Sequence, residues 1–255
     1  MERNTVSATE TQGDHRWSRA GVHLFRRGVA PIVLINGAGG PIAGWYKVYT
    51  SLERLSTVFA YNRLGIGGSD RPMEPQTGDV MVETLRVLLL LANLPPPYLL
   101  VGHSIGGLYA NLFARTYPDE VAGVVLLDAT APDDVRLLTQ HRSTFQRIVE
   151  VVINAVLGKD KFGEVAQAPE TAAIVERADP FPDVPLIVVT GGKPSRLLSA
   201  IARSIRATNQ CALAALSPQG KQVIAERSGH FPQFSEPNVV VGAIREVLAR
   251  CVADV

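Results

Sequence analysis

Short apolar runs alternate along most of the chain with segments of helical spacing. Each run has four to seven residues, is apolar without alternation, and stops at a loop that contains glycine, asparagine or aspartate. Continuous apolar runs of this length are typical of parallel strands that are covered on both faces of a sheet. The predicted strands are residues 32–35, 58–61, 98–101, 121–127, 186–189 and 222–225.

Apolar residues between these strands recur at the spacing of amphipathic helices. One helix is predicted over 80–94 with Asp79 as its N-cap, and another over 105–117. Two more are predicted over 197–212 and 237–251. Alternating strands and helices predict an α/β fold with a doubly wound, mostly parallel sheet. Such sheets place their sites at the carboxyl ends of the strands.

One long stretch, 130–183, separates two predicted strands by more than fifty residues. It contains an apolar helical pattern at 145–157 but no convincing strand. A structureless loop of this length is improbable in a compact domain. We therefore expect an α/β core over 1–130 and 184–255, with a helical cap over 131–183.

Composition narrows the class of protein further. The chain has 255 residues, of which 46% are apolar and 19% charged, and carries 25 Lys and Arg against 24 Asp and Glu. Disordered chains have fewer apolar residues and more net charge, and nucleic-acid-binding surfaces carry an excess of cations. The composition therefore argues against both a disordered chain and a nucleic-acid-binding protein. The length suits one domain of about 250 residues, or a core with a small insert.

The cysteines and the apolar runs bear on compartment and partners. Cys211 and Cys251 have no CxxC or His-x-His neighbour, so we expect free thiols and no metal site. Residues 1–19 lack the apolar core of a signal peptide. The longest apolar run, 87–92, is far shorter than the roughly 20 residues of a membrane helix. We expect a cytoplasmic protein that binds a small-molecule substrate and neither nucleic acid nor membrane; its oligomeric state stays open.

Residues 102–106 read Gly-His-Ser-Ile-Gly between a predicted strand and a predicted helix. This is the G-x-S-x-G pattern in the context that a nucleophilic serine requires. Gly102 and Gly106 lack side chains that would collide where the strand and the helix pack closely. A phosphate-binding turn is the alternative, but the lysine of a P-loop is missing. The pattern therefore predicts Ser104 as a nucleophile.

Four segments share a pattern with a known family, namely 36–40 (NGAGG), 62–69 (NRLGIGGS), 102–107 (GHSIGG) and 228–230 (SGH). With these features the chain resembles proteins of the α/β-hydrolase fold from about residue 20 to the end. The resemblance implies a serine esterase-like or lipase-like hydrolase with a catalytic triad and no metal or organic cofactor. It also places the helical cap between the sixth and seventh strands of the fold.

A serine hydroxyl needs an adjacent base at neutral pH. The resemblance places this base at His230, in the loop after the last strand. The commonest family pattern puts the acid after the fifth predicted strand, yet no Asp or Glu occurs between 184 and 225. Asp128 ends the preceding core strand, at a position that some family members use, and is the predicted acid. Asp133 and Asp134 on the insert are the alternatives.

The oxyanion that forms during acyl transfer needs two amide donors. The backbone N–H of Ile105, directly after the nucleophile, is one expected donor. The resemblance makes the N–H of Ala38 the other. The glycines at 62–67 lack the full dinucleotide-binding spacing and predict a structural turn. The five cations between 184 and 225 predict a solvated helix face.

These residues predict a serine hydrolase that cleaves an ester or related acyl bond of a small, partly apolar substrate through an acyl-enzyme. Other chemistries of the same family stay open, namely C–C bond hydrolysis, acyl transfer and a cofactor-free haloperoxidase reaction. A non-enzymatic receptor that retains the fold and senses a small ligand is the alternative from another class.

Overall fold

A seven-stranded sheet forms the centre of the computed structural model, which describes residues 21–23, 29–140, 163–194 and 199–253. The strand order is β1-β3-β2-β4-β5-β6-β7. Strands β2 to β7 are parallel and β1 pairs antiparallel with β3, which confirms the predicted doubly wound sheet. The strands are β1 (Gly21–His23), β2 (Ile32–Ile35), β3 (Val58–Ala60), β4 (Tyr98–His103), β5 (Val121–Leu127), β6 (Leu186–Gly191) and β7 (Gly220–Ala225).

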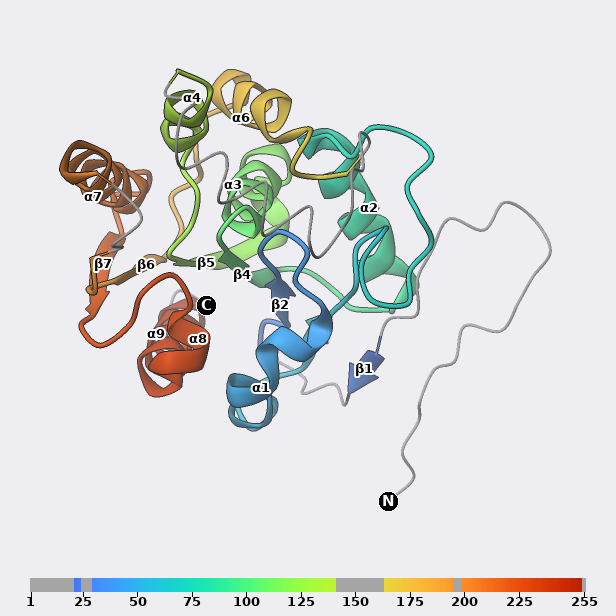
Figure 1. Ribbon diagram of the computed structural model, residues 1–255. Helices are drawn as coiled ribbons and strands as arrows, with labels where there is room; N and C mark the ends of the chain where they lie inside the picture. The colour runs from blue at the N-terminus through green and yellow to red at the C-terminus, as the bar shows by residue number, and fades with distance from the viewer. Residues whose placement is uncertain (1–20, 24–28, 141–162, 195–198, 254–255) are drawn as a thin grey trace.

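Helices cover both faces of this sheet. Figure 1 shows α2, α3, α4, α6 and α7 on one face and α1, α8 and α9 on the other. The bounds are η1 (Ile42–Trp45), α1 (Tyr46–Glu53), α2 (Gly78–Leu91), α3 (Gly106–Thr116), η2 (Pro118–Glu120), α4 (Pro132–Gln140), α6 (Ala168–Arg177), α7 (Ala200–Ala214), α8 (Pro232–Ser235) and α9 (Pro237–Ala253). None of these described helices combines the length and the apolar character that a membrane crossing requires.

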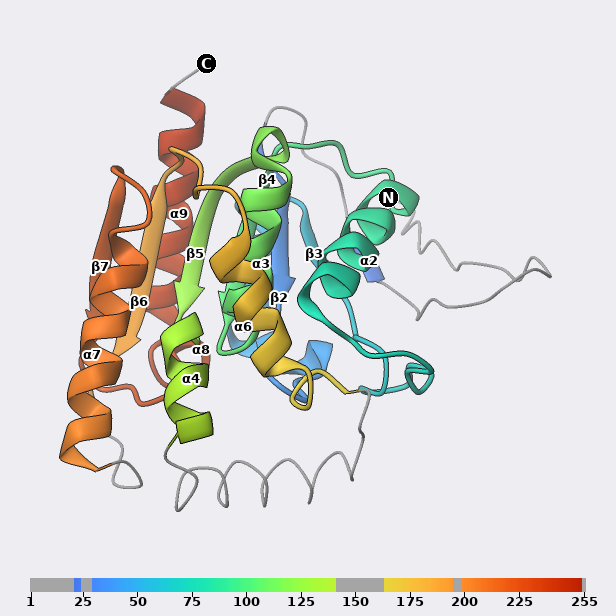
Figure 2. The ribbon, with the colours of Figure 1, turned by 90° about the horizontal axis from the view of Figure 1, so that it is seen from above.

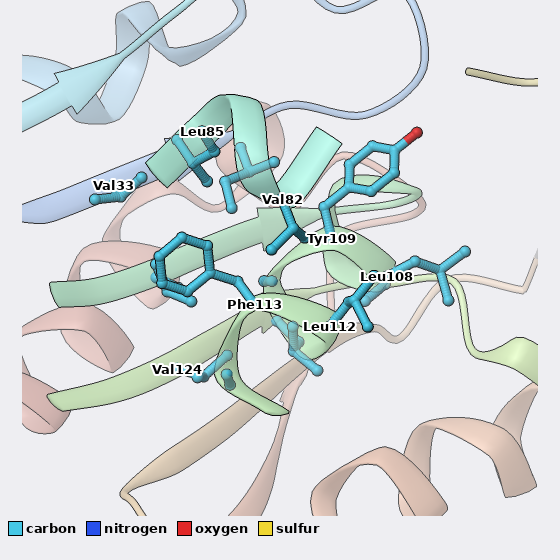
Figure 3. Close-up of a cluster of buried hydrophobic side chains, with 14 of the residues drawn as sticks. Val33, Val82, Leu85, Leu108, Tyr109, Leu112, Phe113 and Val124 are labelled. Carbon is cyan, nitrogen blue, oxygen red and sulfur yellow. The ribbon is translucent and has the colours of Figure 1, made fainter. Parts of the chain in front are cut away.

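The buried side chains explain why the strands are continuously apolar. Val33 and Ile35 of β2 belong to one core cluster, whereas Ile32 and Leu34 belong to a second cluster on the opposite face. Successive side chains of a strand point to opposite faces, so a strand buried on both sides has no polar positions. Figure 3 shows the first cluster, in which side chains of α2 and α3 pack on the sheet.

Helix α2 begins earlier than the sequence pattern predicts. Its first residue is Gly78, and Thr77 rather than Asp79 occupies the N-cap position. Asp79 lies in the first turn, where a negative charge is favourable next to the helix dipole. The predicted N-cap is therefore wrong by two residues, because Thr77 and Asp79 are both of types that commonly cap helices.

The insert expected between the sixth and seventh strands lies between the strands numbered β5 and β6 here. Its described part includes α4 and α6, and α6 packs against α2, α3 and α4. Figure 2 shows α6 lying across α3. The helical pattern predicted at 145–157 falls outside the described residues, and the division into core and cap stays a prediction.

Candidate active site

The turn between β4 and α3 holds Ser104 in the left-handed region, with a φ of 53°. A Cβ atom on Gly102 would come within 2.6 Å of the Gly106 carbonyl oxygen, and one on Gly106 within 2.4 Å of the Ile35 carbonyl oxygen. Real Cβ atoms do not approach backbone oxygens this closely, so both positions require glycine. The strained turn places the Ser104 hydroxyl at the carboxyl end of the central strand.

His230 lies in the loop between β7 and α8, at the same edge of the sheet. Its Nε2 lies 3.0 Å from Ser104 Oγ, although the two residues are 126 positions apart in the chain. The side chain is 42% exposed, so one part of the imidazole is open to solvent. The predicted base thus lies within hydrogen-bond distance of the predicted nucleophile.

Asp128 directly follows β5 and also adopts a positive φ, of 40°. Its Oδ2 lies 2.6 Å from His230 Nδ1, and its Oδ1 accepts a hydrogen bond of 3.2 Å from the Gly191 amide. The Asp128 amide in turn donates to the Val189 carbonyl at 2.7 Å. The structure therefore brings the predicted acid, base and nucleophile into one hydrogen-bonded chain.

The charge of Asp128 fixes the protons in this chain. Burial alone would raise its pKa, but the hydrogen bond from His230 and the charge of Arg206 hold the pKa well below 3.8, its ordinary value. An ionised carboxylate only accepts hydrogen bonds, so His230 Nδ1 carries the proton. In the neutral imidazole Nε2 is then an acceptor, and the Ser104 hydroxyl donates to it.

Arg206 on α7 is a site residue that the sequence reasoning missed. Its Nη2 donates to Asp128 Oδ2 and to the Asp128 carbonyl, both at 2.8 Å. The prediction that this residue belongs to a solvated helix face is therefore wrong. The absence of acids between 184 and 225 was the available signal, because any acidic partner of an arginine there must lie on another element.

The two alternative acids lie on α4 and do not contact His230. Asp134 accepts hydrogen bonds from the Ala131 amide at 2.9 Å and from Asn209 at 2.7 Å, and it pairs with Arg206 at 3.3 Å. The Asp133 side chain is 53% exposed. Asp134 thus caps α4 and joins it to α7, whereas Asp128 alone among the three acids touches the imidazole.

The loop that carries Ala38, one of the two predicted oxyanion donors, packs against the nucleophile turn. A Cβ atom on Gly37 would lie 3.1 Å from Ser104 Cβ, so the loop at 36–40 lies against the serine. No hydrogen bond between described residues uses the N–H of Ala38 or of Ile105. Both amides are therefore available as donors to a ligand bound at Ser104.

His103 supports His230 from behind. Its Nε2 donates to the His230 carbonyl at 2.8 Å, and the two rings lie 4.9 Å apart. Burial and the neighbouring His230 lower the pKa of His103 to about 3, so it stays neutral. The His103 side chain therefore holds the loop of His230 by a hydrogen bond to the backbone of that loop.

Trp45 and the glycine-rich turn at 62–67 have structural roles. Trp45 is fully buried in the second core cluster, whereas Tyr46 is largely exposed. Arg63, in the glycine-rich turn after β3, is buried and paired with Glu164. Within the described ranges, His, Cys, Asp and Glu side chains form no group of three that could hold a metal ion.

Solved structures share this architecture. A thermophilic esterase from Thermogutta terrifontis aligns with a TM-score of 0.66 over 98% of this chain and 99% of its own. The two sequences are 22% identical, so the alignment shows a common fold and no more.

Sequence relatives match all or part of the chain. The uncharacterized protein YqjL of Bacillus subtilis is 25% identical over 247 residues, which cover 95% of this chain and 90% of that protein. The human (lyso)-N-acylphosphatidylethanolamine lipase is 30% identical over 120 residues, or 42% of this chain and 34% of the lipase. The family model described as alpha/beta hydrolase fold matches residues 30–160, just over half of the chain. The chain belongs to the alpha/beta hydrolase fold family.

Proposed function

We propose that this α/β-hydrolase is a serine hydrolase that cleaves an ester or related acyl bond of a small, partly apolar substrate. The observation that carries the proposal is the continuous hydrogen-bonded chain from Ser104 through His230 to Asp128, with contacts of 3.0 and 2.6 Å. An oriented imidazole within reach of a hydroxyl is the arrangement that makes serine nucleophilic at neutral pH.

In the first half-reaction, Ser104 Oγ attacks the carbonyl carbon of the substrate while its proton moves to His230 Nε2. Asp128 keeps the imidazole in the required tautomer and stabilises the imidazolium. The amides of Ala38 and Ile105 donate to the oxyanion of the tetrahedral intermediate. Collapse of the intermediate breaks the bond to the leaving alcohol, which takes the proton from His230 and leaves an acyl-Ser104 ester.

The second half-reaction repeats these steps with water. His230 Nε2 removes a proton from water, and the resulting hydroxide attacks the acyl carbon. The same two amides donate to the second oxyanion. The bond to Ser104 Oγ then breaks, the serine regains its proton from His230, and the carboxylic acid is released.

Two measurements test the proposal. A fluorophosphonate probe should label the wild-type protein at Ser104, as located by peptide mapping, and should leave Ser104→Ala unlabelled. Turnover of p-nitrophenyl esters of graded chain length should fall on the order of 10⁴-fold or more in Ser104→Ala. Equal rates for the wild type and Ser104→Ala with every ester would contradict the proposal, and tight small-molecule binding without turnover would favour a receptor.

A further inference from the structure

A buried ion pair lies directly behind the loop that carries Ala38. Arg63 follows β3 and Glu164 lies in a turn before α6, 101 residues later in the chain. Their side chains are 2% and 6% exposed, and they share contacts of 2.6 Å (Nε to Oε2) and 3.0 Å (Nη2 to Oε1). Burying two charges is costly, so the pair is weak evidence for stability and calls for another role.

The same two side chains bind the backbone of the loop at 36–40. Arg63 Nη1 donates to the Asn36 carbonyl at 2.8 Å, and its Nη2 donates to the Gly37 carbonyl at 2.6 Å. Glu164 Oε1 accepts a hydrogen bond of 2.8 Å from the Gly39 amide. The pair therefore holds the peptide groups on both sides of Ala38.

Peptide geometry transmits this contact to the Ala38 N–H. The Gly37 carbonyl and the Ala38 N–H belong to one trans peptide group, in which the two bonds point in opposite directions. A guanidinium that fixes the carbonyl on one side therefore fixes the direction of the N–H on the other. A charged donor on the carbonyl also polarises the peptide and strengthens its N–H as a donor.

We propose that Arg63 and Glu164 are positioning residues that aim and polarise the Ala38 amide as an oxyanion donor. The inference rests on the proposed serine hydrolase function and deepens it. Glu164 belongs to the segment inserted between β5 and β6, so this donor is complete only when that segment contacts the core. The side chains themselves stay behind the loop and do not touch the reacting atoms.

The test compares kinetic constants for p-nitrophenyl butyrate among matched variants. The double variant Arg63→Met/Glu164→Leu removes both charges, so that neither is left buried without a partner. Arg63→Lys keeps the charge, but a single ammonium cannot reproduce the planar fork of donors. The control is Arg86→Met, which breaks another Arg–Glu pair, with Glu120 at 2.9 Å, on the distant helix α2.

In the double variant and in Arg63→Lys we expect kcat to fall about 10–100-fold, because a misaimed oxyanion donor costs less than the 10²–10³ of a lost one. KM should stay within about twofold, and the inhibition constant of an alkyl trifluoromethyl ketone should rise in proportion to the loss of kcat/KM. The Arg86→Met variant should keep the wild-type constants. A purely structural role would not produce this separation of kcat from KM.

Two results would overturn the inference: wild-type kcat in folded variants, or a rise in KM with unchanged kcat and unchanged affinity for the ketone. Circular dichroism shows whether each variant is folded. If the double variant is unfolded, the kcat, KM and ketone affinity of Arg63→Lys alone test the inference. Failure of the proposed function is distinguishable, because it requires equal ester hydrolysis by the wild type and Ser104→Ala. That result would remove the basis of both proposals.

Discussion

Arg206 donates one hydrogen bond to the carboxylate of Asp128 and another to its backbone carbonyl, each 2.8 Å long. A single side chain thus fixes both ends of the predicted acid, whose backbone has an unfavourable positive φ. The contact comes from α7, the helix that follows β6. In this chain the element after β6 therefore supplies a cation that holds the acid of β5, instead of supplying the acid itself.

Arg206→Met should lower kcat/KM for an ester substrate by about tenfold or more, since a charge-assisted hydrogen bond contributes about 1.5–3 kcal/mol. The reason is a less firmly held carboxylate, and hence a less firmly oriented His230. Lys221→Met is the matched control, because it breaks the partly exposed pair with Glu246 near the start of β7. Equal kinetic constants for Arg206→Met and the wild type would refute the positioning role.

Asp128→Asn should lower kcat on the order of 10³–10⁴-fold, because an amide no longer enforces the tautomer of His230 or stabilises its cation. Asp134→Asn removes one partner of Arg206 but leaves the contact between Asp128 and the imidazole, so its effect on kcat should be much smaller. Steady-state kinetics of both variants decide the matter. A nearly silent Asp128→Asn beside an inactive Asp134→Asn would reverse the assignment of the acid.

The free energy of unfolding should depend on pH through the ionisation of Asp128. Its pKa is held below 3.8 in the folded protein, so the folded state binds fewer protons there than the unfolded state does. The resulting stabilisation is present above about pH 4 and is lost as the pH falls through the lowered pKa. Because Arg206 is one cause of the lowered pKa, Arg206→Met should remove part of this stabilisation.

Urea unfolding of the wild type and Arg206→Met, followed from pH 7 into the strongly acid range below about pH 3, measures this effect. The pH-dependent part of the difference in the free energy of unfolding should be largest near neutral pH and should shrink as the pH falls through the lowered pKa of Asp128. A difference that grows as the pH falls would have the wrong sign for a carboxyl whose pKa is lowered by folding.

Gly106→Ala should destabilise the protein by about 1–3 kcal/mol or more, since the added methyl group collides with backbone oxygens that cannot move aside. Gly242→Ala is the control within α9, where an added Cβ meets nothing within 4 Å. Alanine favours a helix interior over glycine, so this variant should gain about 0.5–1 kcal/mol. Thermal and urea unfolding would check both values, and an undisturbed Gly106→Ala would contradict the steric account of the turn.

Much of the fold is predictable from sequence because each central strand is buried on both faces. β2 and β5 have the bounds that their apolar runs predict, and the carboxyl ends of parallel strands meet at one edge. Ser104, Asp128 and His230 each follow the carboxyl end of a predicted strand, so they could be predicted to lie at the same edge. The short antiparallel strand β1 has only three residues, too few for a pattern to reveal.

The missed residues share a physical cause. The pair of Arg63 and Glu164 joins positions 101 residues apart, and Arg206 reaches Asp128 from 78 residues away. No periodicity or spacing marks such pairs, because each depends on how two helices or loops pack in space. The glycine pattern at 62–67 predicted a structural turn, but it gave no sign that the Arg63 side chain would reach the loop beside Ser104.

Ser104 and Asp128 directly follow neighbouring strands at the centre of the sheet. Main-chain hydrogen bonds join their two turns: the Ser104 amide donates to the Leu127 carbonyl, and the Thr130 amide donates to the Ser104 carbonyl. His230 instead follows β7, the edge strand, whose residues other than Ala225 are only partly covered. Fraying at that edge would withdraw the imidazole while the rest of the molecule keeps its shape. Warming should therefore abolish the catalytic activity reversibly, at temperatures where the far-ultraviolet circular dichroism spectrum of the protein is still native.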